Sequence, residues 1–175
     1  MESLREGVLD AVYALGRIDD QATYEEAHAR LEASLEVLDE TLQDLRYLGD
    51  STPNILDYIL FSFTCRLEPV YYELYKASVG WLDNYPSLLD HARDLYELPE
   101  VQETTDFERI KQGHYLLEPL LNPKQIIPLG GIPDLDAPHL RAEWFGQDGE
   151  GGTEENQDLT RGDGEWVRPV SDERG

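Results

Sequence analysis

The sequence predicts an all-α protein, a helical bundle that ends in an irregular, proline-rich C-terminal segment. Apolar residues recur at steps of three and four between about residues 4 and 117, which is the period of an amphipathic helix. No segment shows sustained alternation of apolar and polar residues, so no sheet is expected. Between Glu118 and Phe145 five prolines interrupt the chain, and they rule out long elements there: Pro119, Pro123, Pro128, Pro133 and Pro138.

The stretch from Asn54 to Tyr75 holds the longest apolar run and is expected to be the central, buried helix. Pro53 cannot extend a helix backwards, and Asn54 and Asp57 have the N-cap and N3 spacing of a capping box. Pro69 lies inside this stretch and is expected to kink or split the helix. A kink at that point can open a cleft.

A first helix is expected from Ser3 to Gly16 and a second from Asp20 to Leu48. Further helices are expected at Pro86–Leu98, in a short turn at Pro99–Thr105 and at Asp106–Leu117. The second helix carries a heptad seam formed by Tyr24, His28, Leu31, Leu35, Leu38, Leu42 and Leu45. Such a seam requires a partner helix, either within the same bundle or across a dimer, and the bundle is the simpler interpretation.

Length and composition indicate one domain over residues 1–146 and a disordered acidic tail over residues 147–175, where glycine, acids and amides dominate. The formal net charge of -23, from 37 acidic and 14 basic side chains, disfavours nucleic acid and anionic membranes as partners. Lysine occurs only at Lys76, Lys111 and Lys124. We interpret this balance as adaptation to a high-salt cytosol, and the alternative is an ordinary acidic domain.

The sequence also gives expectations about location and redox chemistry. The N-terminus is charged from Glu2 and Arg5, and no apolar run is long enough to span a bilayer, so a cytoplasmic protein is expected. The single cysteine, Cys65, excludes an intramolecular disulfide and a metal site built from several cysteines. Because Cys65 lies inside the central helix, we expect an inert buried thiol and assign no catalytic residue.

The common metal, phosphate and hydrolase signatures are absent from the sequence. Asp134, Asp136 and His139 form one acidic and histidine cluster, but neighbouring prolines and the lack of a fourth close ligand favour a structural loop over a metal site. Tyrosine is frequent, with ten in 175 residues. A phenol both donates and accepts hydrogen bonds and its ring stacks, which suits it to holding an aromatic alcohol in a cleft.

Several short motifs resemble the C-terminal helical domain of the glutathionyl-hydroquinone reductases, the xi-class, omega-like branch of the glutathione transferases. They are Val12-Tyr13 with Gly16, Arg46-Tyr47-Leu48, Asn54-x-x-Asp57, Arg66-Leu67-Glu68-Pro69-Val70-Tyr71, Tyr75-Lys76, Asn84-Tyr85-Pro86, Arg93-Asp94-Leu95-Tyr96 with Pro99, His114-Tyr115, Asn122-Pro123, Ile127-Pro128 with Gly130, and Asp134-Leu135-Asp136-Ala137-Pro138-His139 with Arg141. The resemblance covers nearly all of the stretch from Val8 to Gly146 and implies a glutathione-transferase C-terminal-type helical bundle.

The resemblance implies a thiol-dependent reduction of S-conjugated hydroquinones, with Tyr13 and Tyr115 as substrate-binding residues that hydrogen-bond the quinol oxygens. It also implies a homodimer and a hydroquinone-type aromatic ligand. In the family the nucleophilic cysteine lies in a Cys-Pro motif of a thioredoxin-like domain, whereas Cys65 is followed by Arg66. This domain alone is therefore expected to bind no cofactor and to be inactive.

Two functions remain open. In the first, the chain is the substrate-binding and dimer-forming half of such a reductase, and a thioredoxin-like domain in cis or in trans supplies the thiol chemistry. Glutathione or a related low-molecular-weight thiol would then be the co-substrate. In the second, the chain is a non-catalytic helical interaction or scaffold module of the same fold.

Overall fold

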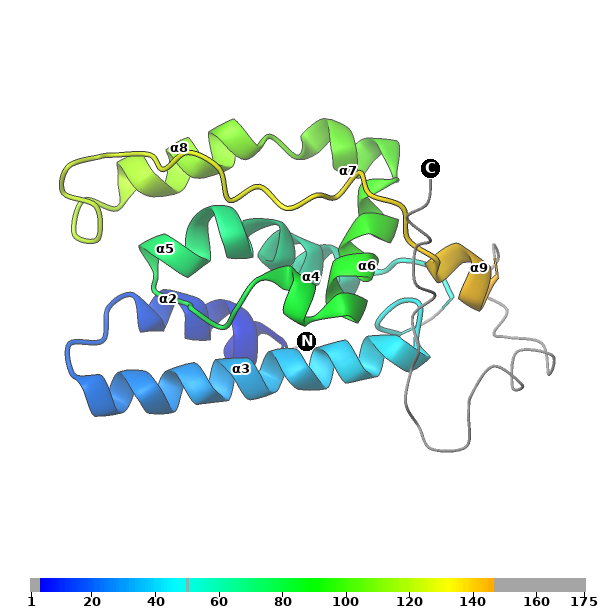
Figure 1. The fold of residues 1–175 in the computed structure, drawn as a ribbon, viewed down its shortest axis with the longest axis horizontal. Helices are drawn as coiled ribbons and strands as arrows, with labels where there is room; N and C mark the ends of the chain where they lie inside the picture. The colour runs from blue at the N-terminus through cyan, green and yellow to red at the C-terminus, as the bar shows by residue number, and fades with distance from the viewer. Residues whose placement is uncertain (1–3, 50, 147–175) are drawn as a thin grey trace, which may run out of the picture.

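The computed structural model describes residues 4–49 and 51–146, and Figure 1 shows their path. The elements run in the order η1 (Arg5–Asp10), α2 (Ala11–Leu15), α3 (Gln21–Asp44), α4 (Ile55–Arg66), η2 (Leu67–Tyr71), α5 (Tyr72–Leu74), η3 (Leu82–Asn84), α6 (Pro86–Tyr96), α7 (Pro99–Thr104), α8 (Phe107–Leu117) and α9 (Arg141–Phe145). Within these ranges no strand occurs, so the predicted all-α class is confirmed. The predicted acidic tail, residues 147–175, lies outside the described residues.

Helix α4 is the central helix, as predicted, and its start is set by the expected capping box. The side-chain oxygen of Asn54 accepts from the Leu56 N–H at 2.8 Å, and Asp57 Oδ2 accepts from the Asn54 N–H at 2.9 Å. These two contacts satisfy backbone donors that the helix itself cannot pair. Helix α6 packs against both α3 and α4, and so joins the two long helices into one core.

The predicted disturbance at Pro69 takes the form of a π-helical turn, η2, that continues α4 without a break in the chain. Proline lacks the N–H that an α-helix would use, and a wider turn absorbs that loss. Helix α5 follows for three residues, and the Ala77 N–H then donates to the Tyr71 carbonyl at 3.0 Å. The π-helical turn and α5 therefore bring the residues around Tyr71 and Tyr75 to the end of the central helix.

Helix α3 lies along one side of the bundle (Figure 1) and presents its seam inward. Leu31, Leu35 and Leu42 are fully buried where α3 packs against η1, α2 and α6, which confirms the bundle interpretation of the heptad pattern. The helix ends at Asp44, not at the predicted Leu48. The reason is a long-range contact, because the Arg141 guanidinium donates to the Leu42 carbonyl at 2.9 Å and to the Leu45 carbonyl at 2.6 Å.

The predicted first helix is divided between the π-helical turn η1 and the short helix α2. Gly16 follows α2, yet its φ of -65° is ordinary helical backbone and not a left-handed cap. Its lack of a side chain is needed for a close approach instead. A Cβ at Gly16 would lie 2.8 Å from Tyr75 Cδ1 and 3.2 Å from the Tyr75 Cα.

The segment after α8 is irregular and lies on the body of the bundle, as predicted, before it reaches α9 at one end (Figure 1). The Lys111 ammonium donates to the Gly130 carbonyl at 2.8 Å, and Arg93 Nε donates to the Asp134 carbonyl at 3.1 Å. Leu135, the residue after the second anchor, is buried. Among the described helices, none has the length and apolar character that crossing a membrane requires.

Candidate functional site

Four aromatic side chains from separate elements meet near the C-terminal end of α2. Tyr13 comes from α2, Tyr71 from η2, Tyr75 from the residue after α5, and His114 from α8. The Tyr13 ring lies 5.8 Å from the Tyr71 ring and 5.0 Å from the Tyr75 ring, both edge to face. The His114 ring stacks on Tyr13 at 6.4 Å and meets the other two rings edge-on. We call these four residues the aromatic cluster.

The hydroxyl groups of the aromatic cluster are hydrogen-bonded, and those of Tyr71 and Tyr75 belong to buried side chains. The Tyr13 and Tyr71 hydroxyls lie 3.3 Å apart, and the Tyr75 hydroxyl donates to Glu118 Oε1 at 3.0 Å. Burial, followed by the hydrogen bond to Tyr13, raises the pKa of Tyr71 above its usual value. Burial and the Glu118 carboxylate do the same to the pKa of Tyr75. Both phenols therefore keep their protons at neutral pH and can donate as well as accept.

His114 links the aromatic cluster to an open groove of about 600 Å³ between the end of α4 and helices α7 and α8. Arg66 and Arg109 line the same groove. Burial, and then the nearby Arg66 charge, lower the pKa of His114, against a smaller opposing effect of Glu118. A neutral imidazole at this point has one donor and one acceptor nitrogen and adds no charge to the groove.

The two sequence-predicted substrate residues do not share one surface. Tyr13 is partly buried within the aromatic cluster, beside the groove that His114 lines. Tyr115 is 4% exposed, and its hydroxyl donates to Glu73 Oε2 at 3.4 Å. No hydrogen bond or ring contact joins Tyr13 to Tyr115 within the described ranges. The substrate roles of Tyr13 and Tyr115 remain predictions, and the residue that α8 places against Tyr13 is His114.

Sequence reasoning passed over His114, although the His-Tyr pair in the motif was the available signal. Consecutive helix positions point about 100° apart, so only one member of the pair can face the aromatic cluster. Lys111 and Tyr115, four residues apart, form the buried side of α8. That rotation of α8 turns His114 toward α2.

Cys65 is buried, as expected, and its surroundings do not activate it. Burial raises the pKa of the Cys65 thiol to about 11, although the adjacent Arg66 acts in the opposite direction. Its sulfur lies 3.6 Å from the Ser62 carbonyl oxygen and 3.3 Å from Arg66 Nη1. A protonated, enclosed thiol is a poor nucleophile, so Cys65 does not supply an activated sulfur.

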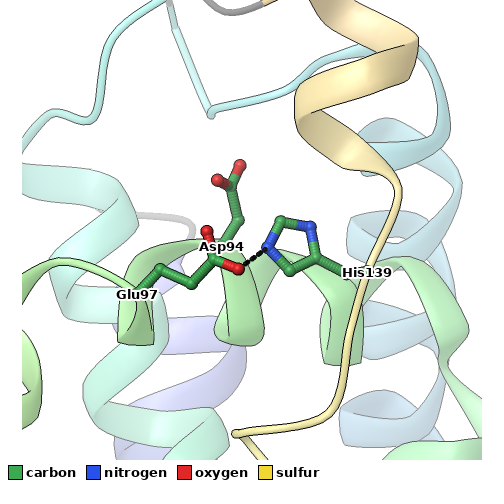
Figure 2. Close-up of side chains that lie close together, drawn as sticks. All are labelled: Asp94, Glu97 and His139. Atoms are coloured by element: carbon green, nitrogen blue, oxygen red, sulfur yellow. Dashed lines mark ion pairs between the residues drawn. The ribbon is translucent and has the colours of Figure 1, made fainter.

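Asp134, Asp136 and His139, which the sequence suggested as one loop cluster, are separated in the structure. His139 lies instead beside two acids of the α6 region. His139 lies with Asp94 and Glu97, and Figure 2 shows how the three side chains converge. Asp136 reaches toward Gln102 instead, at 3.5 Å.

The geometry of the Asp94, Glu97 and His139 group fits an anchor better than a metal site. Both Asp94 oxygens accept from Arg46, at 2.9 Å each. His139 Nδ1 accepts from the Arg141 N–H at 3.3 Å, which leaves the ring proton on Nε2, 3.3 Å from Glu97 Oε1 (Figure 2). A metal on Nε2 would move the ring proton to Nδ1, which faces the Arg141 N–H donor. The group ties the C-terminal segment to α6.

Comparison with known proteins places these features in a family context. The family described as "Glutathione S-transferase, C-terminal domain" matches residues 21–94. The glutathionyl-hydroquinone reductase YqjG of Escherichia coli is 33% identical over 139 residues, which covers 79% of this chain and 42% of that protein. A glutathione S-transferase omega-like protein of Schizosaccharomyces pombe is 31% identical over 134 residues, covering 74% of this chain and 42% of its own length.

Solved structures agree with the sequence relatives. A glutathione transferase from Gordonia bronchialis superposes with a TM-score of 0.77 at 35% identity, over 81% of this chain and 44% of that one. A xi-class transferase from Natrialba magadii gives a TM-score of 0.76 at 31% identity, over 81% of this chain and 44% of its own. The chain thus spans less than half the length of the relatives that it matches.

Proposed function

Because this chain belongs to the glutathionyl-hydroquinone reductase branch of the glutathione transferases, as a C-terminal helical domain, we propose that it binds the aromatic half of an S-conjugated hydroquinone. The observation that supports this proposal is the aromatic cluster beside an open groove. In this proposal the partly buried rings of Tyr13 and His114 stack on a quinol ring, with the buried rings of Tyr71 and Tyr75 packed behind them. The Tyr13 hydroxyl would exchange hydrogen bonds with a quinol oxygen. Tyr115, which is less accessible, keeps its proposed role only if a ligand displaces its contact with Glu73.

The reductive chemistry is assigned to a second domain. A thiolate attacks the sulfur of the thioether, the bond between that sulfur and the ring carbon breaks, and the ring carbon takes up a proton to give the free hydroquinone. A second thiol, glutathione or a related small thiol, then reduces the resulting mixed disulfide. Cys65 is buried and protonated and does not fit the first role. We therefore assign the attacking sulfur to a thioredoxin-like domain, in cis or in trans.

Equilibrium binding of hydroquinone, followed by tyrosine and tryptophan fluorescence, tests the binding role. Replacing Tyr13 by Phe should weaken binding about fivefold to tenfold, which corresponds to about 1 kcal/mol for one lost hydrogen bond. Tyr58→Phe is the matched control, because Tyr58 is 41% exposed on α4 and is not one of the four clustered residues. Equal affinities of all three proteins for hydroquinone would contradict the proposal.

A turnover assay tests the assignment of the thiol. The chain alone should not reduce an S-glutathionyl hydroquinone, and Cys65→Ser should leave hydroquinone binding unchanged. Turnover by the chain alone that disappears in Cys65→Ser would make Cys65 the nucleophile and overturn the assignment.

The second proposed role is association into a homodimer. Three leucines at the end of α8 or in the segment that follows it are largely exposed, with Leu117 at 76%, Leu120 at 88% and Leu129 at 100%. We propose that these side chains contribute to one surface that a partner covers, because contiguous exposed apolar patches are typical of interfaces. Light scattering after gel filtration should give twice the chain mass, and Leu120→Asp combined with Leu129→Asp should give the chain mass. A monomeric wild-type protein would remove this role.

The same surface also favours the alternative function, a non-catalytic helical interaction module. The two functions differ in ligand binding. A dimer that does not bind hydroquinone, or that binds it equally with Tyr13 and with Phe at that position, supports the interaction module. A dimer whose affinity for hydroquinone depends on Tyr13 supports the substrate-binding domain.

A further inference from the structure

Arg66 is exceptional among the arginines in the described part of the chain. Each of the others lies within 4.0 Å of a carboxylate: Arg5, Arg17, Arg30, Arg46, Arg93, Arg109 and Arg141. Arg66 has no such partner there, although the sequence contains 37 acidic side chains and only 14 basic ones. In so acidic a chain, an arginine without an ion pair indicates a guanidinium that can accept an anionic ligand.

The hydrogen bonds of Arg66 leave one edge of its guanidinium unused. Nη1 donates to the Ser62 carbonyl at 2.5 Å and contacts Cys65 Sγ at 3.3 Å. Neither Nε nor Nη2 has a hydrogen-bond partner among the described residues. These two nitrogens form the edge of the fork that matches the two oxygens of a carboxylate.

Arg66, whose guanidinium has this free edge, lines the groove beside the aromatic cluster. His114 lines the same groove and stacks on the Tyr13 ring, so one side chain contacts both places. A ligand ring that lies against the aromatic cluster can therefore extend a substituent into the groove. This step rests on the proposed function, because it takes the aromatic cluster as the site of the ring.

Of the two arginines that line the groove, Arg66 is the one without a carboxylate partner among the described residues. Arg109 Nε lies 3.1 Å from Asp106 Oδ2, and Asp106 Oδ1 also accepts from the Arg109 N–H at 3.0 Å as the cap of α8. Glu103 is exposed on α7 and lies more than 4.0 Å from the Arg66 guanidinium nitrogens, since no ion pair joins them. His114 is neutral at neutral pH, because burial and Arg66 lower its pKa.

We infer that Arg66 binds a carboxylate of the aromatic ligand, so that the groove selects acidic conjugates over neutral ones. The carboxylate has two possible sources: a substituent on the hydroquinone ring, or the peptide part of the thiol conjugate. Both present the same planar pair of oxygens to the guanidinium. A purely structural Arg66, which only caps the end of α4 through Ser62, predicts no such selectivity.

Binding of matched acids and esters tests the inference on the unmodified chain, at the lowest salt concentration at which circular dichroism shows it folded. The first pair is 2,5-dihydroxybenzoate and its methyl ester, and the second is glutathione and its diethyl ester. In at least one pair the acid should bind about tenfold more tightly than the ester, the strength expected of a charge-assisted hydrogen bond. The pair that shows the preference identifies the source of the carboxylate.

Arg66→Met keeps the apolar stem of the side chain and should abolish the preference for the acid. It should leave the affinity for plain hydroquinone unchanged. Arg30→Met, which removes one charge from the exposed side of α3, is the matched control and should keep the preference. Arg66→Lys keeps the charge without the fork and should retain a reduced preference, which separates loss of charge from loss of fold.

The outcomes distinguish the inference from the proposed function. Hydroquinone binding that depends on Tyr13, without any acid preference in either pair, overturns the inference and leaves the function standing. An acid preference that survives in folded Arg66→Met also overturns it. An acid preference that is lost in Arg66→Met, in a protein that does not bind plain hydroquinone, supports the role of Arg66 and contradicts the function. Absence of binding by every probe overturns both.

Discussion

His91 Nε2 lies 2.9 Å from Asp57 Oδ1, and both side chains are completely buried. The other contacts of Asp57 are backbone donors, the Leu48 N–H at 2.7 Å and the Asn54 N–H at 2.9 Å. One carboxylate therefore joins the loop after α3, the cap of α4 and the middle of α6. The aromatic cluster depends on this arrangement, because α4 leads into the π-helical turn that carries Tyr71.

We predict that acid weakens the fold through His91. Burial lowers the pKa of His91 from its ordinary 6.5, although the hydrogen bond to Asp57 opposes this. The unfolded chain then binds a proton that the folded chain does not, so this contribution is complete above pH 6.5 and is lost as the pH falls. Free energies of unfolding, measured by denaturant in molar KCl from pH 8 to pH 5, should fall with a slope of at most about 1.4 kcal/mol per pH unit per proton.

The control for this prediction is His91→Gln, which should flatten the slope whatever its overall stability. His114→Gln measures how much of the slope comes from His114, the other histidine whose pKa is lowered. Asp57 adds a further loss only at lower pH. Burial acts to raise its pKa, but the hydrogen bonds from His91, Leu48 and Asn54 outweigh that effect and lower it below 3.8. A stability that rises on acidification in both the wild type and His91→Gln would contradict the assignment.

Asn54→Ala should lower the free energy of unfolding by about 1 kcal/mol, because it removes the acceptor for the Leu56 N–H at the start of α4. Asn54→Asp, which keeps an oxygen at the same place, should remain within about 0.5 kcal/mol of the wild type. Denaturant curves of the three proteins provide the comparison. Identical midpoints for Asn54→Ala and the wild type would show that the cap does not contribute.

Two glycines form a matched pair with opposite expectations. Gly16→Ala places a Cβ 2.8 Å from Tyr75 Cδ1 and should destabilise the fold by about 1–3 kcal/mol, the usual cost of overpacking. Gly113→Ala meets no atom within 4 Å and lies within α8, so it should stabilise the protein by about 0.5–1 kcal/mol. Thermal melts report both changes. A Gly16→Ala variant as stable as Gly113→Ala would show that the contact with Tyr75 adjusts freely.

Low salt should unfold or loosen the chain, because its net charge of -23 repels itself when screening is weak. The Debye length grows from about 3 Å at 1 M salt to about 30 Å at 10 mM. Circular dichroism in KCl from molar to millimolar concentration should show a loss of helix, and sucrose at matched osmolality should not prevent it. A spectrum that does not change over this range would contradict adaptation to high salt.

Local patterns predicted the helices well wherever the cause of an element lies within a few residues of it. The capping box at Asn54 and the proline effect at Pro69 are both of this kind. The end of α3 was predicted too late, because it is set by Arg141, 99 positions beyond Leu42. No local pattern contains that contact.

The sequence predicted that tyrosines would form the candidate site, but it did not predict which side chain of α8 joins them. Tyr13 was found from its motif and lies in the aromatic cluster, whereas the choice between His114 and Tyr115 depends on how α8 is rotated. Both side chains have an apolar ring and a polar group, so their chemistry does not decide which one faces α2. The buried Lys111 and its contact with Gly130 settle the rotation.

The reach of Arg141 to the end of α3 also bears on how the protein matures during translation. The last carbonyls of α3 gain their partner only after residue 141 has emerged from the ribosome, when α3 itself has long been synthesised. A nascent chain that ends at α8 lacks Arg141, so we expect the end of α3 to fray more than in residues 1–175. We therefore expect the end of α3 to be fixed late, once Arg141 can reach it.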